Sequence, residues 1–403
     1  MANMDYDIIV VGAGIVGTSM AAYLSQTLAA DTRIALVAPA APIADAEPFD
    51  ARVVAMTEAS RQLFEQLDVW RNIAGQRACP YRDMQVWDGE GSGHIEFNAA
   101  DVGRDSLGHI VEHRVLNQAL ERALELTRVQ RWQQPVSALL RDNNGAVSGV
   151  ELDSGETLAA PLTIAADGAR SKLRQLAGIT ERQWPYQQSA IVATVRCEKP
   201  HEFTARQRFM STGPLALLPL IEAPGASSGH HCSIVWSADQ GFADTLMAQD
   251  DASFCASLER HFESRLGVIE HVSKRYAFAL HQRHAKQYVQ PGLALIGDAA
   301  HSIHPLAGQG VNLGLLDVAG LGHELQRAGA RGLATGEYST LRRYERQRMG
   351  HNLTMMAAME SFKRVFGSRQ PALTLMRNRA LSGVNSQPAL KSFLAQQAMG
   401  LSL

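Results

Sequence analysis

The first 40 residues contain the pattern that most restricts how this chain can fold. A run at residues 6–11, YDIIVV, is apolar apart from Asp7 and leads into GAGIVG, in which Gly12, Gly14 and Gly17 have the spacing GxGxxG. The segments TSMAAYLSQTLA and RIALVA that follow have the character of a buried helix and a second buried strand. This order predicts a βαβ unit that binds a nucleotide pyrophosphate, because the glycines allow a tight turn and close approach while the helix N-terminus supplies free N–H groups.

A membrane helix is the alternative for this stretch, since residues 8–30 carry no charge and are long enough to span a bilayer. Three glycines in its first half argue against one continuous helix. Asp5 and Asp7 precede it, where a signal peptide would carry positive charge. The chain has 403 residues, of which 46% are hydrophobic and 19% charged, as in a globular protein of two or more domains. We therefore predict a cytoplasmic protein.

The net charge and the spacing of the cysteines and histidines argue against a nucleic-acid-binding protein and against a metalloprotein. The formal net charge of −2 gives no argument for nucleic-acid binding. The four cysteines are scattered without the paired spacing of a zinc site, so reduced thiols are expected. His301 and His304 are three residues apart, as are His281 and His284, but a metal site needs three or four convergent ligands. No metal is expected.

The second predicted strand departs from the usual dinucleotide pattern at its end. Such a strand normally ends in Asp or Glu, which binds a ribose hydroxyl, but here the position holds Ala38. A charge-assisted hydrogen bond contributes about 1.5–3 kcal/mol, so its loss corresponds to roughly ten- to hundredfold weaker binding of the nucleotide. Asp45 and Glu47 in the following loop are the candidates for a rerouted ribose contact.

Two later motifs resemble ligand-binding turns at strand ends. An Asp-Gly pair at 167–168 follows the apolar run LTIAA, although such a pair by itself most often marks an ordinary turn. The strand LALIG delivers Asp298 to its carboxyl end, where the carboxylate can accept hydrogen bonds from a polyol chain. Pro305 stiffens the next loop, and Gly308 and Gly310 let backbone N–H groups face a ligand closely. A helix begins after this loop, and its dipole favours negative charge.

Taken in order, GxGxxG, the mid-chain DG and GDAAH…P…GQGxNxG resemble the FAD-dependent aromatic hydroxylases of the para-hydroxybenzoate hydroxylase fold. Within that family, VWDGEGSGHIEF, GPLALLPL, CSIVWS and the closing QQAMGL are similar to the ubiquinone-biosynthesis hydroxylases, most of all the 2-polyprenylphenol hydroxylase branch. The resemblance implies FAD, O2 as co-substrate, and NAD(P)H or another electron donor as reductant. It further implies ring hydroxylation of a polyprenylphenol in ubiquinone biosynthesis through a flavin C4a-hydroperoxide.

The resemblance also assigns roles to individual positions, and it identifies no catalytic base. The first motif is expected at the pyrophosphate, Asp298 at the ribityl chain, and the loop that follows at the pyrimidine edge of the flavin. The DG pair is expected at both FAD and NAD(P)H. The expected cofactor-binding residues are Gly12, Gly14, Ile15, Val16, Gly17, Arg52, Glu112, Arg114, Val136, Asp167, Gly168, Asp298, Pro305, Gly308, Gln309, Gly310, Val311, Asn312 and Leu313.

The predicted fold class is α/β (α+β), with a Rossmann-like FAD-binding domain, an inserted antiparallel-sheet substrate domain and a C-terminal helical region. Four strand-like segments separated by turns lie between residues 180 and 285 and form the basis for the second domain. We assign 1–80, 110–178 and 286–330 to the FAD domain, 81–109 and 179–285 to the substrate domain, and 331–403 to the helical region.

The C-terminal 43 residues carry a one-sided charge. After Glu360 there is no acidic residue, whereas six basic residues remain: Lys363, Arg364, Arg369, Arg377, Arg379 and Lys391. One interpretation is a basic amphipathic surface in peripheral contact with the inner face of the membrane, where a polyprenylated substrate resides. The other is a solvated helical face packed on the flavin domain. A complex of ubiquinone-biosynthesis enzymes or a homo-oligomer is a further candidate partner, and nucleic acid is not.

Three alternative functions remain open from the sequence. A hydroxylase of a small soluble phenol would use the same chemistry. A flavin-dependent isoprenoid reductase would share GxGxxG and the late GD motif. A non-catalytic subunit of a lipid-biosynthetic assembly, with its FAD lost, is favoured only by Ala38.

Overall fold

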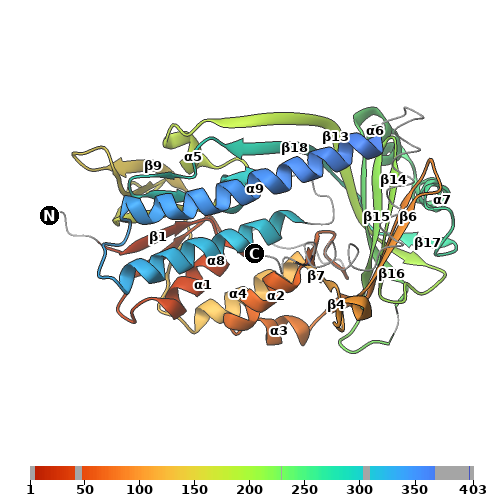
Figure 1. Cartoon of the computed structure of the whole chain (residues 1–403), viewed down its shortest axis with the longest axis horizontal. Coiled ribbons are helices and arrows are strands. Elements are labelled where there is room, and N and C mark those ends of the chain that lie inside the picture. Colours follow the sequence, from red (N-terminus) through yellow and green to blue (C-terminus); the bar gives the residue numbers. More distant parts are fainter. Residues whose placement is uncertain (1–4, 41–47, 228, 303–308, 368–398, 400–403) are drawn as a thin grey trace.

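The computed structural model describes residues 5–40, 48–227, 229–302, 309–367 and 399. Two large sheets form the framework and lie in different halves of the molecule (Figure 1). The long helix α9 (Tyr338–Gly367) extends along both halves and contacts strands of both sheets. The α/β class, with a Rossmann-like domain and a second sheet domain, is confirmed.

The first sheet contains the predicted βαβ unit. Its strand order is β19-β20-β12-β1-β2-β8, and every neighbouring pair is parallel except β19 and β20. The strands are β1 (Ile8–Val11), β2 (Ile34–Val37), β8 (Gln130–Trp132), β12 (Leu162–Ala165), β19 (Val289–Gln290) and β20 (Leu293–Leu295). Every residue of β1, β2, β12 and β20 is buried, which explains why these segments are continuously apolar in sequence.

Helices and smaller sheets cover this framework. Helix α1 packs against α4, α8 and β2, while β10 packs against β12. One small sheet has the order β11-β10-β9 and another the order β3-β7-β4. The helices are α1 (Ile15–Thr27), α2 (Glu58–Gln66), α3 (Trp70–Ala74), α4 (His113–Glu125), α5 (Lys172–Leu176) and α8 (Gln309–Gly329). The strands are β3 (Val53–Met56), β4 (Ala78–Tyr81), β7 (Gly108–Glu112), β9 (Val136–Arg141), β10 (Val147–Leu152) and β11 (Thr157–Ala159).

The second sheet has the order β21-β18-β13-β16-β15-β14-β5-β6, with β17 pairing additionally with β13. Its strands are β5 (Asp83–Asp88), β6 (His94–Asn98), β13 (Glu181–Cys197), β14 (Thr204–Met210), β15 (Gly213–Leu220), β16 (His231–Asp239), β17 (Ile269–Val272), β18 (Tyr276–Ala285) and β21 (His301–Ser302). The pair β5–β14 is parallel, so this sheet is mixed rather than wholly antiparallel as predicted. The reason is that β5 belongs to a distant part of the chain and joins the sheet from outside the hairpin series.

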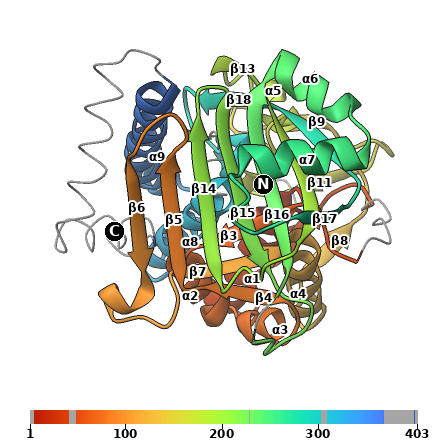
Figure 2. The same ribbon diagram turned by 90° about the vertical axis from the view of Figure 1, so that its right-hand side faces the viewer.

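Two helices within the predicted strand region were missed by the sequence analysis. Helices α6 (Gln240–Ala248) and α7 (Asp251–His261) lie in front of the second sheet in Figure 2. The start of α7 has a local signal, because Asp250 accepts a hydrogen bond from the Ser253 N–H at 2.8 Å. Their apolar residues bury one face of the sheet around Trp236, whose ring lies 5.8–6.0 Å from those of Phe242 and Phe254.

The prediction that residues 8–30 do not form a membrane helix is confirmed. The stretch contains strand β1, the glycine turn and helix α1. Among the described residues, no helix has the length and apolar character needed to cross a membrane.

The two tryptophans at 236 and 184 provide a test of the packing on the second sheet. Trp236 is fully buried and Trp184, on the adjacent strand β13, is 45% exposed. We expect Trp236→Ala to lower the free energy of unfolding by about 3–5 kcal/mol because it leaves a cavity. Trp184→Ala is the matched control and should change it by about 0.5 kcal/mol or less. Urea denaturation measures both, and equal losses would contradict the assigned burial.

Candidate cofactor site

The three motifs meet at the carboxyl edge of the first sheet. Strands β1, β12 and β20 are neighbours and parallel, so the turns that follow them lie side by side. Backbone hydrogen bonds continue past the strand ends, from Ala166 N–H to the Val11 carbonyl at 2.8 Å and from Ile296 N–H to the Ala165 carbonyl at 3.0 Å. The structure therefore places GxGxxG, the DG pair and Asp298 at the edge where ligands of parallel sheets bind.

The glycines of the first motif differ in what surrounds them. A Cβ on Gly12, which has a φ of +111°, would lie 2.3 Å from the Ala166 carbonyl oxygen. A Cβ on Gly17 would lie 1.9 Å from the Gly12 carbonyl oxygen. Around the position of a Cβ on Gly14, in contrast, no atom of the described residues lies within 4 Å. Two glycines thus serve internal packing, while Gly14 leaves open space at the N-terminus of α1.

This open space fits the pyrophosphate of FAD. Gly14 is exposed and caps α1, and neither it nor the first turn carries an acidic side chain. The first N–H groups of a helix, here from Ile15 onward, have no partner within the helix and are available to an anion. Backbone donors with no competing carboxylate match a phosphate in both charge and geometry.

Close packing also joins the first motif to the third. A Cβ on Gly314 of α8 would lie 2.6 Å from Val16 Cγ2, and one on Gly297 would lie 3.1 Å from Val16 Cγ1. The Val16 side chain therefore fills the space between α1, the turn after β20 and α8.

Asp298 lies on the short 3-10 turn η2 (Gly297–Ala299) directly after β20. Its side chain is exposed, yet the protein atoms crowded around it raise the pKa of its carboxyl group by desolvation. Asp298 is thus reachable by a ligand hydroxyl, as the predicted ribityl contact requires.

The predicted residues Arg52, Glu112 and Arg114 come together through Asp50. The Asp50 carboxylate accepts hydrogen bonds from the Arg52 N–H at 2.9 Å and the Arg114 N–H at 3.0 Å. The buried Glu112 accepts one from the Asp50 N–H at 2.6 Å and pairs with Arg77 at 2.9 Å. Burial raises the pKa of Glu112, and these partners oppose the shift. The sequence analysis missed Asp50 and Arg77, although Asp50 stands only two residues before Arg52.

Asn312 connects α8 to β3 and to the start of α2. Its side-chain oxygen accepts hydrogen bonds from the Ser60 hydroxyl at 2.7 Å and the Thr57 N–H at 3.1 Å, and its amide donates to the Ala55 carbonyl at 2.9 Å. The side chain is buried and fixes the first turn of α8 to β3 and α2.

The other predicted residues are distributed as follows. The Asp167 carboxylate accepts hydrogen bonds from the Ser171 hydroxyl and the Leu173 N–H, at the start of α5, and Gly168 has a φ of +82°. Val136 and Leu313 are buried. Gly310 and Val311 begin α8 and are half-buried. Outside the described residues lie Pro305, Gly308, the side chain of Gln309, and the candidate ribose contacts Asp45 and Glu47.

The sequence analysis rejected a metal-binding role for His301, and the structure places this residue in a buried polar cluster. Its Nε2 atom lies 2.5 Å from the carboxylate of Asp317, which also pairs with Arg348 at 2.8 Å. His284, its cross-strand partner, lies 3.0 Å from the hydroxyl of Tyr288. Among the described residues, no group of three or more His, Cys, Asp or Glu is arranged to hold a metal.

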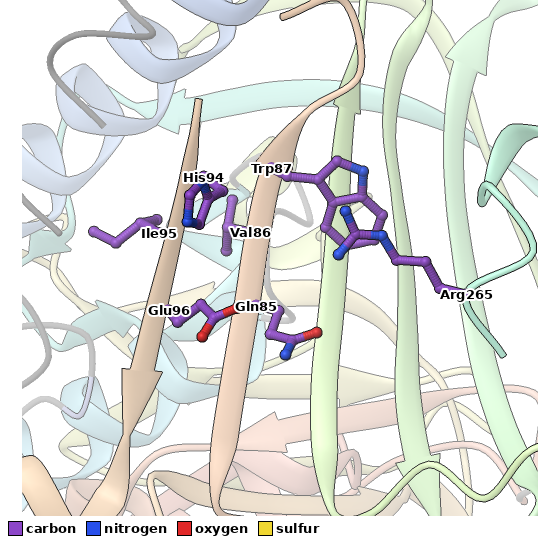
Figure 3. Close-up of a pocket in the computed structure, with 7 residues that line it drawn as sticks. All are labelled: Gln85, Val86, Trp87, His94, Ile95, Glu96 and Arg265. Atoms are coloured by element: carbon purple, nitrogen blue, oxygen red, sulfur yellow. The ribbon is translucent and has the colours of Figure 1, made fainter. Parts of the chain in front are cut away.

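A separate cavity of about 290 Å³ lies at the far edge of the second sheet. It is lined by side chains of β5 and β6, together with Arg265, whose guanidinium stacks on Trp87 at 3.8 Å from the ring centre (Figure 3). None of the predicted cofactor residues lines it. This cavity is therefore distinct from the candidate cofactor site.

Comparison with known families and proteins identifies the family of this chain. A family model described as an FAD binding domain matches residues 5–358. The chain is 39% identical over 401 residues to the 3-demethoxyubiquinol 3-hydroxylase of Escherichia coli K12, and the match covers all of both chains. It is 32% identical to the human mitochondrial ubiquinone biosynthesis monooxygenase COQ6, covering 96% of this chain and 91% of the relative.

Among solved structures, similarity extends over the same length. PqsL of Pseudomonas aeruginosa, described as a probable FAD-dependent monooxygenase, superposes with a TM-score of 0.76 at 20% identity, covering 94% of this chain and 99% of the other. The p-nitrophenol 4-monooxygenase PnpA of Pseudomonas putida gives 0.76 at 18% identity, covering 99% of both chains. At these identities the likeness shows a common fold.

The different surroundings of Gly14 and Gly17 predict different phenotypes. Gly14→Ala places a methyl group in the open space, so we expect FAD to bind at least tenfold more weakly while the apoprotein remains as stable as the wild type. Gly17→Ala forces α1 away from the Gly12 carbonyl and should cost at least about 1–3 kcal/mol of stability. FAD titration and urea unfolding of both variants distinguish the two roles. Unchanged FAD affinity in Gly14→Ala would refute the assigned pyrophosphate position.

Three histidines predict acid sensitivity. Desolvation lowers the pKa values of His109, His113 and His284 to about 4, from 6.5. Between pH 6.5 and 4 the unfolded chain therefore binds protons that the folded chain does not. We expect the free energy of unfolding to fall with falling pH across this window, by up to about 1.4 kcal/mol per pH unit for each histidine.

Urea unfolding at pH 6.5, 5.5 and 4.5 measures this slope. The variant His284→Gln keeps a hydrogen-bonding side chain but cannot titrate, so its slope should be smaller by about one histidine's share. A free energy of unfolding that is constant over this range would contradict the prediction.

Proposed function

This chain belongs to the FAD-binding family of flavin-dependent monooxygenases, within it to the ubiquinone-biosynthesis hydroxylases, and from this premise we propose that it hydroxylates the ring of a polyprenylated phenol. FAD is its cofactor, with O2 as co-substrate and NAD(P)H as the reductant usual for this class. The observation that carries the substrate proposal is 39% identity, over the full length of both chains, to a 3-demethoxyubiquinol 3-hydroxylase. We propose the same type of substrate here, a hydroquinone or phenol with an isoprenoid tail.

Bound FAD supplies the activation of O2 to an electrophilic oxygen that an electron-rich phenol ring can attack. The chain contributes binding and orientation. The N–H groups at the start of α1 would hold the pyrophosphate, and Asp298 would bind the ribityl hydroxyls. The close packing of Val16 between Gly297 and Gly314 fixes the position of the start of α1 relative to the turn that carries Asp298.

An exposed aromatic residue on the second sheet supports an apolar substrate. Phe278 of β18 pairs with Ala190 of β13. The residue after Ala190 on β13, Ile191, packs into the hydrophobic core between the second sheet and the helices α6 and α7. Because successive side chains of a strand alternate in direction, Phe278 lies on the face of the sheet turned away from these helices. It is 47% exposed, so an apolar ring or tail has an aromatic surface to contact.

The isoprenoid tail makes the membrane the source of the substrate, and we include peripheral membrane contact through the region 331–403 in the proposal. Six basic residues and no acidic residue follow Glu360 in this region. The side chains of all six lie outside the described residues. The support for membrane contact is therefore charge complementarity with anionic lipid. A complex with other enzymes of the pathway, or between copies of the chain, is part of the same proposal.

Analysis of a gene-deletion strain tests the proposed function most directly. We expect it to accumulate a polyprenylated phenol that lacks one ring hydroxyl, with 3-demethoxyubiquinol as the first candidate, and to be restored by the wild-type gene. The purified protein should be yellow and should consume O2 and reductant in step with product when the substrate is supplied in vesicles.

The alternatives predict other outcomes. Faster turnover of a phenol without the tail would identify a hydroxylase of small phenols. Reduction without O2 consumption would identify a reductase, and a colourless protein that takes up no FAD would identify a non-catalytic subunit. An unchanged quinone content in the deletion strain would refute the proposal.

A further inference from the structure

Asp317 of α8 is the centre of a polar cluster directly behind the turn that carries Asp298. The residue is fully buried. One carboxylate oxygen accepts a hydrogen bond from the Gly297 N–H at 2.9 Å and lies 2.5 Å from His301 Nε2. The other accepts from Arg348 Nε of α9 at 2.8 Å. A single side chain thus contacts both ends of the segment 297–301 and binds it to a helix that is distant in sequence.

The charge state of this carboxylate follows from its partners. Burial alone would raise the pKa of Asp317, but His301 and Arg348 outweigh this effect and hold it at about 2. The carboxylate is therefore ionised at neutral pH and can only accept hydrogen bonds. It follows that His301 Nε2 carries the proton between the two groups, which fixes the orientation of the imidazole ring.

The hydrogen bonds continue from Arg348 through α9 to His284 of β18. Asn352 of α9 accepts from Arg348 at 2.9 Å and donates to the Tyr288 hydroxyl at 3.3 Å. That hydroxyl lies 3.0 Å from His284 Nε2, and His284 is the cross-strand partner of His301. The turn after β20 is therefore supported from α8, α9 and β18 together.

We propose that Asp317 is a positioning residue for the flavin, which holds the Gly297 N–H and the His301 ring so that Asp298 is presented to the cofactor. Gly297 has a φ of +58°, which a glycine adopts without steric strain, and in this conformation its N–H donates to the Asp317 carboxylate. The inference deepens the proposed function in that it rests on FAD as the cofactor, and it does not depend on the identity of the substrate.

Glu345 of α9 provides a matched control. Like Asp317 it is a buried carboxylate that accepts a backbone hydrogen bond, from the Tyr288 N–H at 2.8 Å, and pairs with an arginine, Arg342. Among the described residues, Glu345 bonds the backbone N–H of Tyr288 and the Arg342 side chain, and it makes no hydrogen bond to the segment 297–302. Loss of charge at Glu345 therefore reports the general cost of removing a buried carboxylate, without disturbing the turn.

The test compares Asp317→Asn with Glu345→Gln. We expect both apoproteins to have a lower melting temperature, but only Asp317→Asn to raise the Kd for FAD, by at least tenfold, in a titration followed by flavin fluorescence. The absorption spectrum of the flavin bound to Asp317→Asn should also differ from that of the wild type. Equal increases in Kd for the two variants would overturn the inference, since they would show a merely structural role.

A second pair of variants keeps the test decisive if Asp317→Asn does not fold. His301→Gln retains a side-chain N–H that can donate to Asp317, whereas His301→Leu does not. We expect the Kd for FAD to be near the wild-type value in the first and raised at least tenfold in the second. Wild-type affinity in His301→Leu would overturn the inference. Because FAD binding is measured without substrate, a failure of hydroxylation alone refutes the proposed function and leaves this result unaffected.

Discussion

The arrangement of this protein depends on backbone contacts so close that they leave no room for a Cβ atom. At the carboxyl edge of the first sheet, Gly17 packs on the carbonyl of Gly12, and Gly12 packs on that of Ala166. Gly297 and Gly314 leave the space that Val16 occupies. These contacts bring α1, the turn after β12 and the start of α8 to one place. Helix N–H groups and the Asp298 carboxylate consequently face the same region, which is what a long cofactor such as FAD requires.

Buried charges are the second constraint, and two carboxylates near the candidate cofactor site, Glu112 and Asp317, have partners from other parts of the chain. Glu112 bonds the Asp50 N–H and pairs with Arg77, while Asp317 bonds the Gly297 N–H and pairs with Arg348. A buried carboxylate without such partners would be strongly destabilising. Because these partners include the backbone of the loops proposed to bind the cofactor, the same interactions that stabilise the charges also hold these loops. The stability of the fold and the geometry of the proposed site therefore depend on the same contacts.

Much of the fold was predictable because its signals are local. The apolar runs of β1, β2, β12 and β20 reflect strands buried on both faces, and the glycine spacing marks a turn whose geometry only small residues allow. The helices α6 and α7 were missed because they lie between strand-like segments. Their apolar residues pack against the second sheet, and this packing is not visible in the sequence of the helices themselves. The parallel pairing of β5 with β14 joins segments more than 100 residues apart, so no local pattern indicates it.

For the site, the sequence by itself determined which chemical groups come to the carboxyl edge: the open glycine turn, Asp298 and the start of α8. These follow from motif spacing and from the rule that parallel strands end at one edge. Only the tertiary structure decided what holds them, since Asp317 is 16 residues from His301 and 31 from Arg348, on different elements. Such contacts depend on how helices pack across the sheet, and the energy of a buried ion pair appears only once both partners are removed from water.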